Sequence, residues 1–165
     1  MSDITKQSLS ELVKNIKEKK LSSKEVTKAF IDRSEKSKEL NAYISEDYSS
    51  ALEKAKKFDE KPNLDLKLPG IPMAVKDLFC TKNVRTTAGS KILNNFVPTY
   101  ESTVTQNIWN EGAILLGKLN CDEFAMGSSN ETSFFGNVQN PIDKNLVPGG
   151  SSGGSASSVA AQLTP

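Results

Sequence analysis

Two short, almost wholly apolar segments constrain the fold of this chain more than any other feature. They are Ile71–Lys76, which follows a Pro-Gly turn, and Ala113–Lys118. Residues 102–111 between them have the apolar spacing of a helix, and Gly112 is placed to cap its end. An apolar strand that follows a helix is typical of a parallel sheet buried on both faces, so we predict an α/β fold.

The first 62 residues have a different character, because they are rich in lysine and in helical spacing of apolar residues. Ser8 and Glu11 have the spacing of a capping box, and Ser22 and Glu25 repeat it. Residues 48–58 continue the helical pattern. The lysines fall on the polar faces of these expected helices, and we interpret them as solvated rather than as a binding patch.

The chain has 165 residues, enough for one ordinary domain with its own core. We divide it into a helical N-terminal region, residues 1–62, and the start of an α/β core, residues 63–165. The expected architecture is a mixed sheet flanked by helices. Residues 155–163 indicate a helix of small residues that needs covering, so we expect the domain to continue past residue 165.

Composition excludes several classes of function. The net charge is +1, so no strong field attracts nucleic acid or a membrane. Cys80 and Cys121 do not have the spacing of metal ligands, and we predict no metal site. No apolar stretch approaches the ~18 residues of a membrane span, and Met1–Lys6 lacks the apolar core of a signal peptide. We therefore expect a cytoplasmic protein without membrane contact.

The sequence contains no histidine, which limits the choice of a general base. A base that works near neutral pH must then be a carboxylate, a lysine or a supplied group. Lys76 is the candidate, since it directly follows an apolar strand. Its amine either reaches water at the strand end or is desolvated and acts as a base in place of histidine. Asp77 either orients this lysine or is a turn residue.

Residues 127–154 are rich in Gly, Ser, Asn and Pro, which indicates a long ordered loop or a linker. Pro148–Ala156 has the composition of a flexible Gly/Ser linker. It is not a P-loop, because no lysine stands at the required place. Since it leads directly into a helix-like run, the alternative is a tight loop at a helix N-terminus, where glycines let the backbone approach a ligand.

Three motifs in order resemble the amidase-signature family. Gly70–Asp77 is similar to the family's lysine motif, and Pro148–Ala156 is similar to its Gly/Ser signature. Residues 120–141 between them resemble in particular the branch of glutamine-hydrolysing subunits of tRNA-dependent amidotransferases. Leu21–Ser23 and Leu40–Tyr43 are similar as well. The resemblance covers nearly the whole chain and implies the N-terminal part of a single amidase domain.

The resemblance implies a Ser–Ser–Lys triad, a serine/lysine variant of nucleophilic acyl transfer. By motif, Lys76 matches the lysine and Ser151 matches the bridging serine. The family holds that serine through a cis peptide bond, which makes Gly150 before it apt. Ser152 and Ser155 would support the loop.

The resemblance also implies that Met126, Gly127 and Ser128 line the acyl pocket beside the Gly/Ser loop. The alternative is an ordered turn that merely packs there. The nucleophilic serine and the oxyanion donors are expected in a second glycine-rich motif, about two dozen residues beyond Ser151. We therefore expect residues 1–165 on their own to be inactive.

The function implied by the resemblance is hydrolysis of glutamine to glutamate and ammonia. The ammonia would convert Glu-tRNA(Gln) to Gln-tRNA(Gln) in a complex with B and C subunits. This chain would bind no cofactor, because ATP and magnesium would be handled mainly by the B subunit. Two alternatives stay open: a stand-alone amidase of the same family that takes another amide, and a non-catalytic interaction module that uses the helical region.

Overall fold

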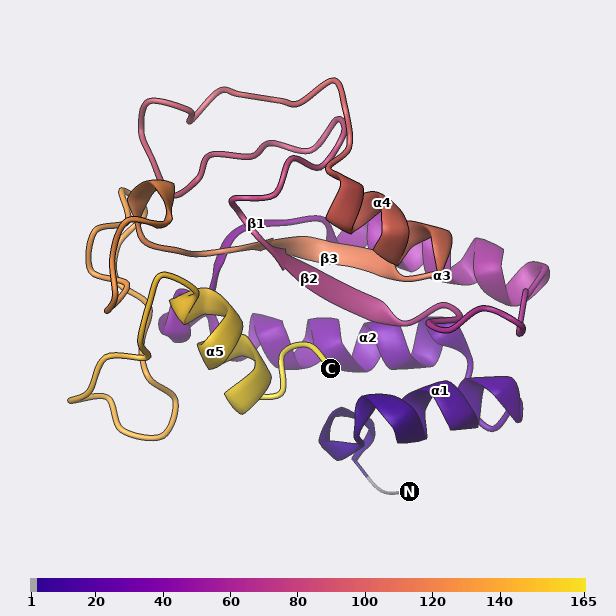
Figure 1. Cartoon of the computed structure of the whole chain (residues 1–165). Coiled ribbons are helices and arrows are strands. Elements are labelled where there is room, and N and C mark those ends of the chain that lie inside the picture. Colours follow the sequence, from indigo (N-terminus) through magenta and orange to yellow (C-terminus); the bar gives the residue numbers. More distant parts are fainter. Residues whose placement is uncertain (1–2) are drawn as a thin grey trace.

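The computed structural model describes residues 3–165, which form a three-stranded mixed sheet with helices packed around it (Figure 1). The α-helices are α1 (Leu9–Lys17), α2 (Ser23–Glu35), α3 (Tyr48–Glu60), α4 (Thr103–Asn110) and α5 (Gly153–Ala160). The strands are β1 (Tyr43–Glu46), β2 (Pro72–Lys76) and β3 (Ile114–Leu119). Short 3-10 helices are η1 (Ile4–Lys6), η2 (Lys38–Leu40) and η3 (Glu123–Ala125). The predicted fold class is confirmed. Met1 and Ser2, which belong to the predicted helical region and to the segment Met1–Lys6 considered above, lie outside the described residues.

The central strand of the sheet is β3, which is buried along its whole length. It pairs in parallel with β2 and antiparallel with β1. The prediction of two parallel apolar strands with a helix between them is thus confirmed. The sequence did not reveal β1, which lies within the region interpreted as helical. This strand has four residues, is partly exposed, and pairs irregularly with β3 between Tyr43 and Ser45. So short an edge strand carries too little alternation to be recognised.

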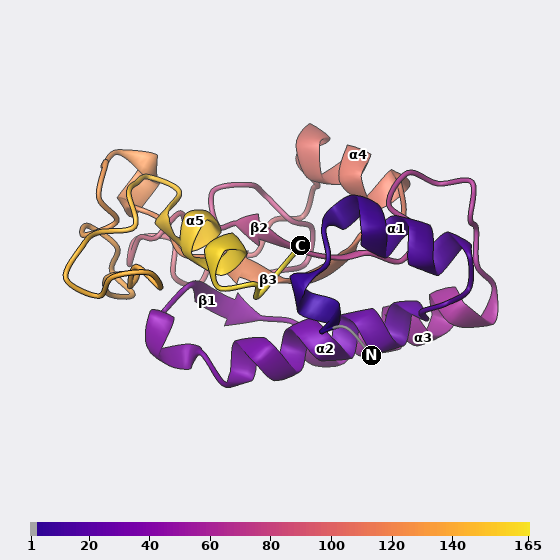
Figure 2. The same cartoon turned by 90° about the horizontal axis from the view of Figure 1, so that it is seen from below.

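The helices α1, α2 and α3 form one layer against the sheet, and α4 lies above the sheet in Figure 1, apart from that layer (Figures 1 and 2). The main core lies between this helical layer and strands β2 and β3. Its buried members are Leu12, Ile16, Val26, Phe30, Ile31, Ala51, Ala55, Ile71, Ile114 and Leu116. The apolar spacing found in the first 62 residues therefore corresponds to the buried faces of real helices.

Both predicted capping boxes are present. Ser8 Oγ accepts from the N–H of Glu11 at 3.3 Å, and Ser22 Oγ accepts from the N–H of Glu25 at 3.1 Å. The two glutamates accept in return from the cap N–H groups at 2.8 Å each. These contacts satisfy donors that a helix start leaves free, and so they fix where α1 and α2 begin. Gly112, predicted as a cap, follows α4 with φ +93°.

Residues 126–152 form an ordered loop rather than a linker. Ser133 is buried within it and donates from Oγ to Asn120 Oδ1 at 2.6 Å. Asn120 Nδ2 donates to the carbonyls of Asn41 and Gly136 at 3.1 Å each. A side chain just after β3 therefore ties this loop to the segment that leads into β1.

Strand β3 also contains a fully buried lysine, although the sequence indicated an apolar strand. The contacts of Lys118 Nζ are the carbonyl of Phe79 at 2.7 Å, Thr86 Oγ1 at 2.8 Å, Thr81 Oγ1 at 3.1 Å and Asp77 Oδ1 at 3.6 Å. Burial raises the pKa of Asp77 and lowers the pKa of Lys118, and the attraction between the two charges opposes both shifts. Asp77 is therefore the partner of Lys118 and anchors the segment that leaves β2.

Replacing Lys118 by methionine should destabilise the protein strongly. Lys118→Met leaves the Asp77 carboxyl buried without its cation, so we expect the free energy of unfolding to fall by about 3–5 kcal/mol in urea denaturation. Asp77→Asn in the Lys118→Met background should recover part of this loss.

The matched control for this change is Lys28→Met, which breaks the exposed pair between Lys28 Nζ and Asp32 Oδ2 at 2.7 Å. Because exposed pairs are screened by water, this variant should lose less than about 1 kcal/mol. Equal, small losses in Lys118→Met and Lys28→Met would contradict the anchoring role of the buried pair.

Candidate active site

The two motifs that the sequence singled out meet at the end of β2. Lys76 is the last residue of β2, and Ser151 lies in the loop just before α5, which packs against that strand. Lys76 Nζ donates to Ser151 Oγ at 2.7 Å and to Ser152 Oγ at 3.0 Å. Lys76 is half-buried, so its amine neither lies in a sealed core nor extends freely into water.

The Gly/Ser loop is a tight turn into α5. The peptide bond between Gly150 and Ser151 is cis, and Ser152 is the residue before the first helical position. The carbonyl of Ser152 accepts from the N–H of Ala156 at 3.0 Å. Ser155 is half-buried in the first turn of the helix. Of the alternatives raised by the sequence, the structure adopts the ordered loop at a helix N-terminus.

Met126, Gly127 and Ser128 follow η3 and lead to the same place. Gly127 is half-buried, Ser128 is exposed, and the side chain of Met126 is 84% exposed. The segment continues into Ser129, whose backbone N–H lies against Gly150. These residues therefore border the Gly/Ser loop as an open surface, and their part in substrate binding stays a prediction.

Asp122 lies between these two segments and was missed as a member of the site. Its side chain is fully buried, and its backbone N–H donates to the carbonyl of Ser151 at 3.2 Å. A sequence signal was present, because Asp122 comes shortly after β3 ends at Leu119. Polar residues that follow parallel strands gather at one edge of the sheet, which is where α/β proteins place their sites.

The neighbouring thiol is a poor candidate for the nucleophile. Cys121 is buried, and this burial raises the pKa of its thiol to about 11. A thiol with so high a pKa stays protonated at neutral pH, and thiolate is the reactive form.

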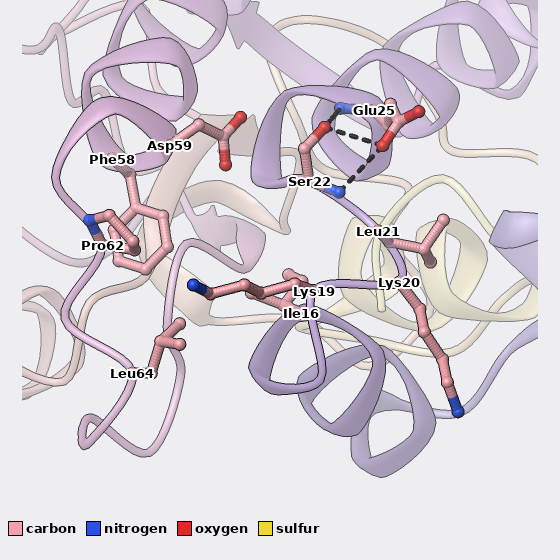
Figure 3. Close-up of a pocket in the computed structure, with 10 residues that line it drawn as sticks. All are labelled: Ile16, Lys19, Lys20, Leu21, Ser22, Glu25, Phe58, Asp59, Pro62 and Leu64. Atoms are coloured by element: carbon pink, nitrogen blue, oxygen red, sulfur yellow. Dashed lines mark hydrogen bonds between the residues drawn. The ribbon is translucent and has the colours of Figure 1, made fainter.

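A pocket of about 400 Å³ lies elsewhere, beside the end of α3 and the start of α2 (Figure 3). It is near the beginning of β2, whereas Lys76 stands at the opposite end of that strand. Its acidic groups are already engaged: Asp59 accepts from the N–H groups of Ser23 and Lys24 at 2.8 and 2.9 Å, and Glu25 closes a capping box. We therefore assign this pocket to helix packing and not to chemistry.

Within residues 3–165, the structure contains no group of three or more His, Cys, Asp or Glu side chains able to hold a metal ion. None of the helices in this part of the chain is long and apolar enough to cross a membrane.

The comparisons with known proteins agree with the geometry. The family model described as Amidase matches residues 25–165, so the chain belongs to the amidase family. Over its whole length it is 82% identical to the A subunit of the glutamyl-tRNA(Gln) amidotransferase of Pelagibacter ubique (strain HTCC1062), and it covers 34% of that protein. The resemblance stated from the motifs is thereby confirmed.

Solved structures give the same picture. The A subunit of the glutamyl-tRNA(Gln) amidotransferase from Thermotoga maritima matches with a TM-score of 0.81 and 34% identity, over 99% of this chain and 34% of that chain. A peptide amidase from Stenotrophomonas maltophilia matches with a TM-score of 0.86 and 30% identity, over 96% of this chain and 35% of that chain. The chain spans about a third of the length of the curated relatives it matches.

Proposed function

We propose that this chain is the lysine- and serine-bearing part of the glutamine-hydrolysing subunit of a tRNA-dependent amidotransferase. The observation that carries the proposal is the 2.7 Å hydrogen bond from Lys76 Nζ to Ser151 Oγ, which joins motifs 75 residues apart. A chain without histidine needs another base for acyl transfer, and a lysine held against a serine can supply one. The choice of substrate rests on the name of the relative that is 82% identical.

The proposed chemistry is nucleophilic acyl transfer. A serine from the second glycine-rich motif, expected beyond residue 165, attacks the carboxamide carbon of glutamine. The hydroxyl proton of this nucleophile passes to Ser151 Oγ, while the hydroxyl proton of Ser151 passes to the neutral amine of Lys76. A proton then returns along the same path to the amide nitrogen of glutamine, which leaves as ammonia. Water then hydrolyses the acyl-enzyme to glutamate. Ser152 accepts a second hydrogen bond from Lys76 and so keeps the amine aimed at the loop.

The remaining steps fall to partners. The released ammonia would amidate Glu-tRNA(Gln) in a complex with B and C subunits. ATP and magnesium would act mainly through the B subunit, and this chain would hold no cofactor. We place the complex in the cytoplasm, where translation takes place.

A second candidate is a stand-alone amidase with another amide substrate. The similarity to a peptide amidase, with a TM-score of 0.86, supports this candidate, because the same fold can act on other amides. Co-purification of the full-length protein with B and C subunits, and ammonia release that depends on glutamine, would separate the two.

Lys76→Ala in the full-length enzyme should lower kcat for glutamine hydrolysis by about 100- to 10,000-fold, the range for loss of a general base. Lys76→Arg should fail as well, because a guanidinium keeps its proton near neutral pH. The assay is ammonia release with the melting temperature measured in parallel. Lys82→Ala, at an exposed lysine, is the control. Near-wild-type turnover in either Lys76 variant would remove Lys76 from the mechanism.

Ser128→Ala should lower kcat/KM for glutamine about 5- to 10-fold, as expected when one hydrogen bond to substrate is lost. Because Ser128 is exposed, the melting temperature should stay unchanged. Ser10→Ala, at an exposed serine of α1, is the matched control. If the kinetics are unchanged and only the melting temperature falls, then the segment merely packs beside the loop.

Residues 1–165 expressed alone should release no ammonia from glutamine. No serine follows Ser158 in this stretch, and a lysine–serine pair without a nucleophile forms no acyl-enzyme. The same segment carrying Lys76→Ala gives the blank. Ammonia above that blank would place the nucleophile within residues 1–165 and overturn its assignment to the second glycine-rich motif.

A further inference from the structure

We propose that Asp122 is a positioning residue, whose buried carboxylate holds Ser151 and the segment after Gly127 in the arrangement that the reaction requires. The inference deepens the proposed function and rests on it. It assigns to Asp122 no contact with substrate, only control of the two segments to which the proposed function gives proton transfer and substrate binding.

The carboxylate of Asp122 is the acceptor at the centre of the loop that follows η3. Its Oδ2 accepts from the N–H of Asn130 at 2.9 Å. Its Oδ1 accepts from Thr132 Oγ1 at 2.8 Å and from the N–H of Thr132 at 3.3 Å. With both oxygens engaged in this way, the carboxylate sets the path of residues 127–132.

The same residue also sets the position of the Gly/Ser loop. The N–H of Asp122 donates to the carbonyl of Ser151 at 3.2 Å. Ser151 is also the residue whose Oγ accepts from Lys76 Nζ. A side chain on Gly150 would overlap Asp122 Oδ2, and one on Gly127 would overlap Asp122 Cγ. Asp122 is therefore packed between the two glycines, and movement of its carboxylate is transmitted to both segments.

The electrostatics fit a fixed acceptor rather than a proton carrier. Burial alone would raise the pKa of Asp122, but hydrogen bonds from Thr132 and Asn130 outweigh it and lower the pKa. The group stays ionised at neutral pH and keeps both oxygens available to donors. Asp122→Asn retains the side-chain volume but replaces one carboxylate oxygen by an amide NH2 group. This group is a donor, and it then faces another N–H or O–H donor in place of an acceptor.

The test uses the full-length enzyme with Asp122→Asn. We expect kcat for glutamine hydrolysis, measured well below the melting temperature, to fall about 10- to 100-fold, because a displacement near 1 Å at reacting groups has this effect. Hydrogen exchange should become about 10- to 100-fold faster at residues 127–132 and 148–154 only, since a hydrogen bond to a charged group is lost there. The control is Glu131→Gln, an isosteric change at an exposed carboxylate in the same loop.

A second variant covers the case in which Asp122→Asn does not fold. Thr132→Val, at an exposed residue, removes the hydrogen bond from Oγ1 to Asp122 together with the one that Oγ1 accepts from the N–H of Glu123 at 3.0 Å, and it leaves the contact of Asn130 with Asp122 in place. It should give a smaller loss of kcat with faster exchange in the same two segments. Unchanged kcat in folded Asp122→Asn, or exchange that rises uniformly along the chain, would overturn the positioning role.

The two proposals fail in different ways. If the wild-type enzyme releases no ammonia from glutamine, the proposed function is wrong. Hydrogen exchange then decides the positioning inference without any substrate: faster exchange confined to residues 127–132 and 148–154 supports it. Exchange equal to that of Glu131→Gln contradicts it.

Discussion

The parallel pairing of β2 with β3 is the interaction on which the rest of this structure depends. Its register places Lys76 opposite Leu119, so the chain leaves both strands at the same edge of the sheet. Parallel strands require a crossover, here through α4, and the residues after each strand then face a common region. Lys76 and Asp122, which are distant in sequence, come to act on one loop because of this geometry.

Polar anchors, rather than apolar packing, organise that edge of the sheet. Asp77 with Lys118 fixes the segment that leaves β2, Asn120 ties residues 126–152 to the start of β1, and Asp122 holds the turn before α5. Each is fully buried and hydrogen-bonded. Directional bonds of this kind specify one arrangement of long loops, which an apolar cluster would leave less well defined. This accounts for an ordered site built largely from irregular backbone.

The sequence predicted the parts of the fold that follow from periodicity and local chemistry. It predicted β2, β3 and α4, the two capping boxes, and the pairing of Lys76 with the Gly/Ser loop through family resemblance. It missed β1, because four partly exposed residues carry little pattern. It also treated Lys118 as part of an apolar strand, since nothing local shows that a lysine in a strand will meet a buried carboxylate from another segment. The position of Asp122 after β3 could have marked it as a member of the site, but its role could not be predicted, because its hydrogen-bond partners are defined only after the loops close.

The Gly/Ser run shows why composition alone misleads here. Glycine and serine in series favour a flexible linker by local reasoning. In the structure, a side chain on Gly154 would overlap the carbonyl of Asn120, and the N–H of Gly154 donates to that carbonyl at 3.0 Å. Gly150 is likewise packed on the backbone of Ser129 and Asn130. The glycines thus serve close approach between backbones, and the resulting loop is fixed enough to hold Ser151 against Lys76. A loop that was free to move would lose the hydrogen bond from Lys76 Nζ to Ser151 Oγ, which depends on a fixed position of both residues.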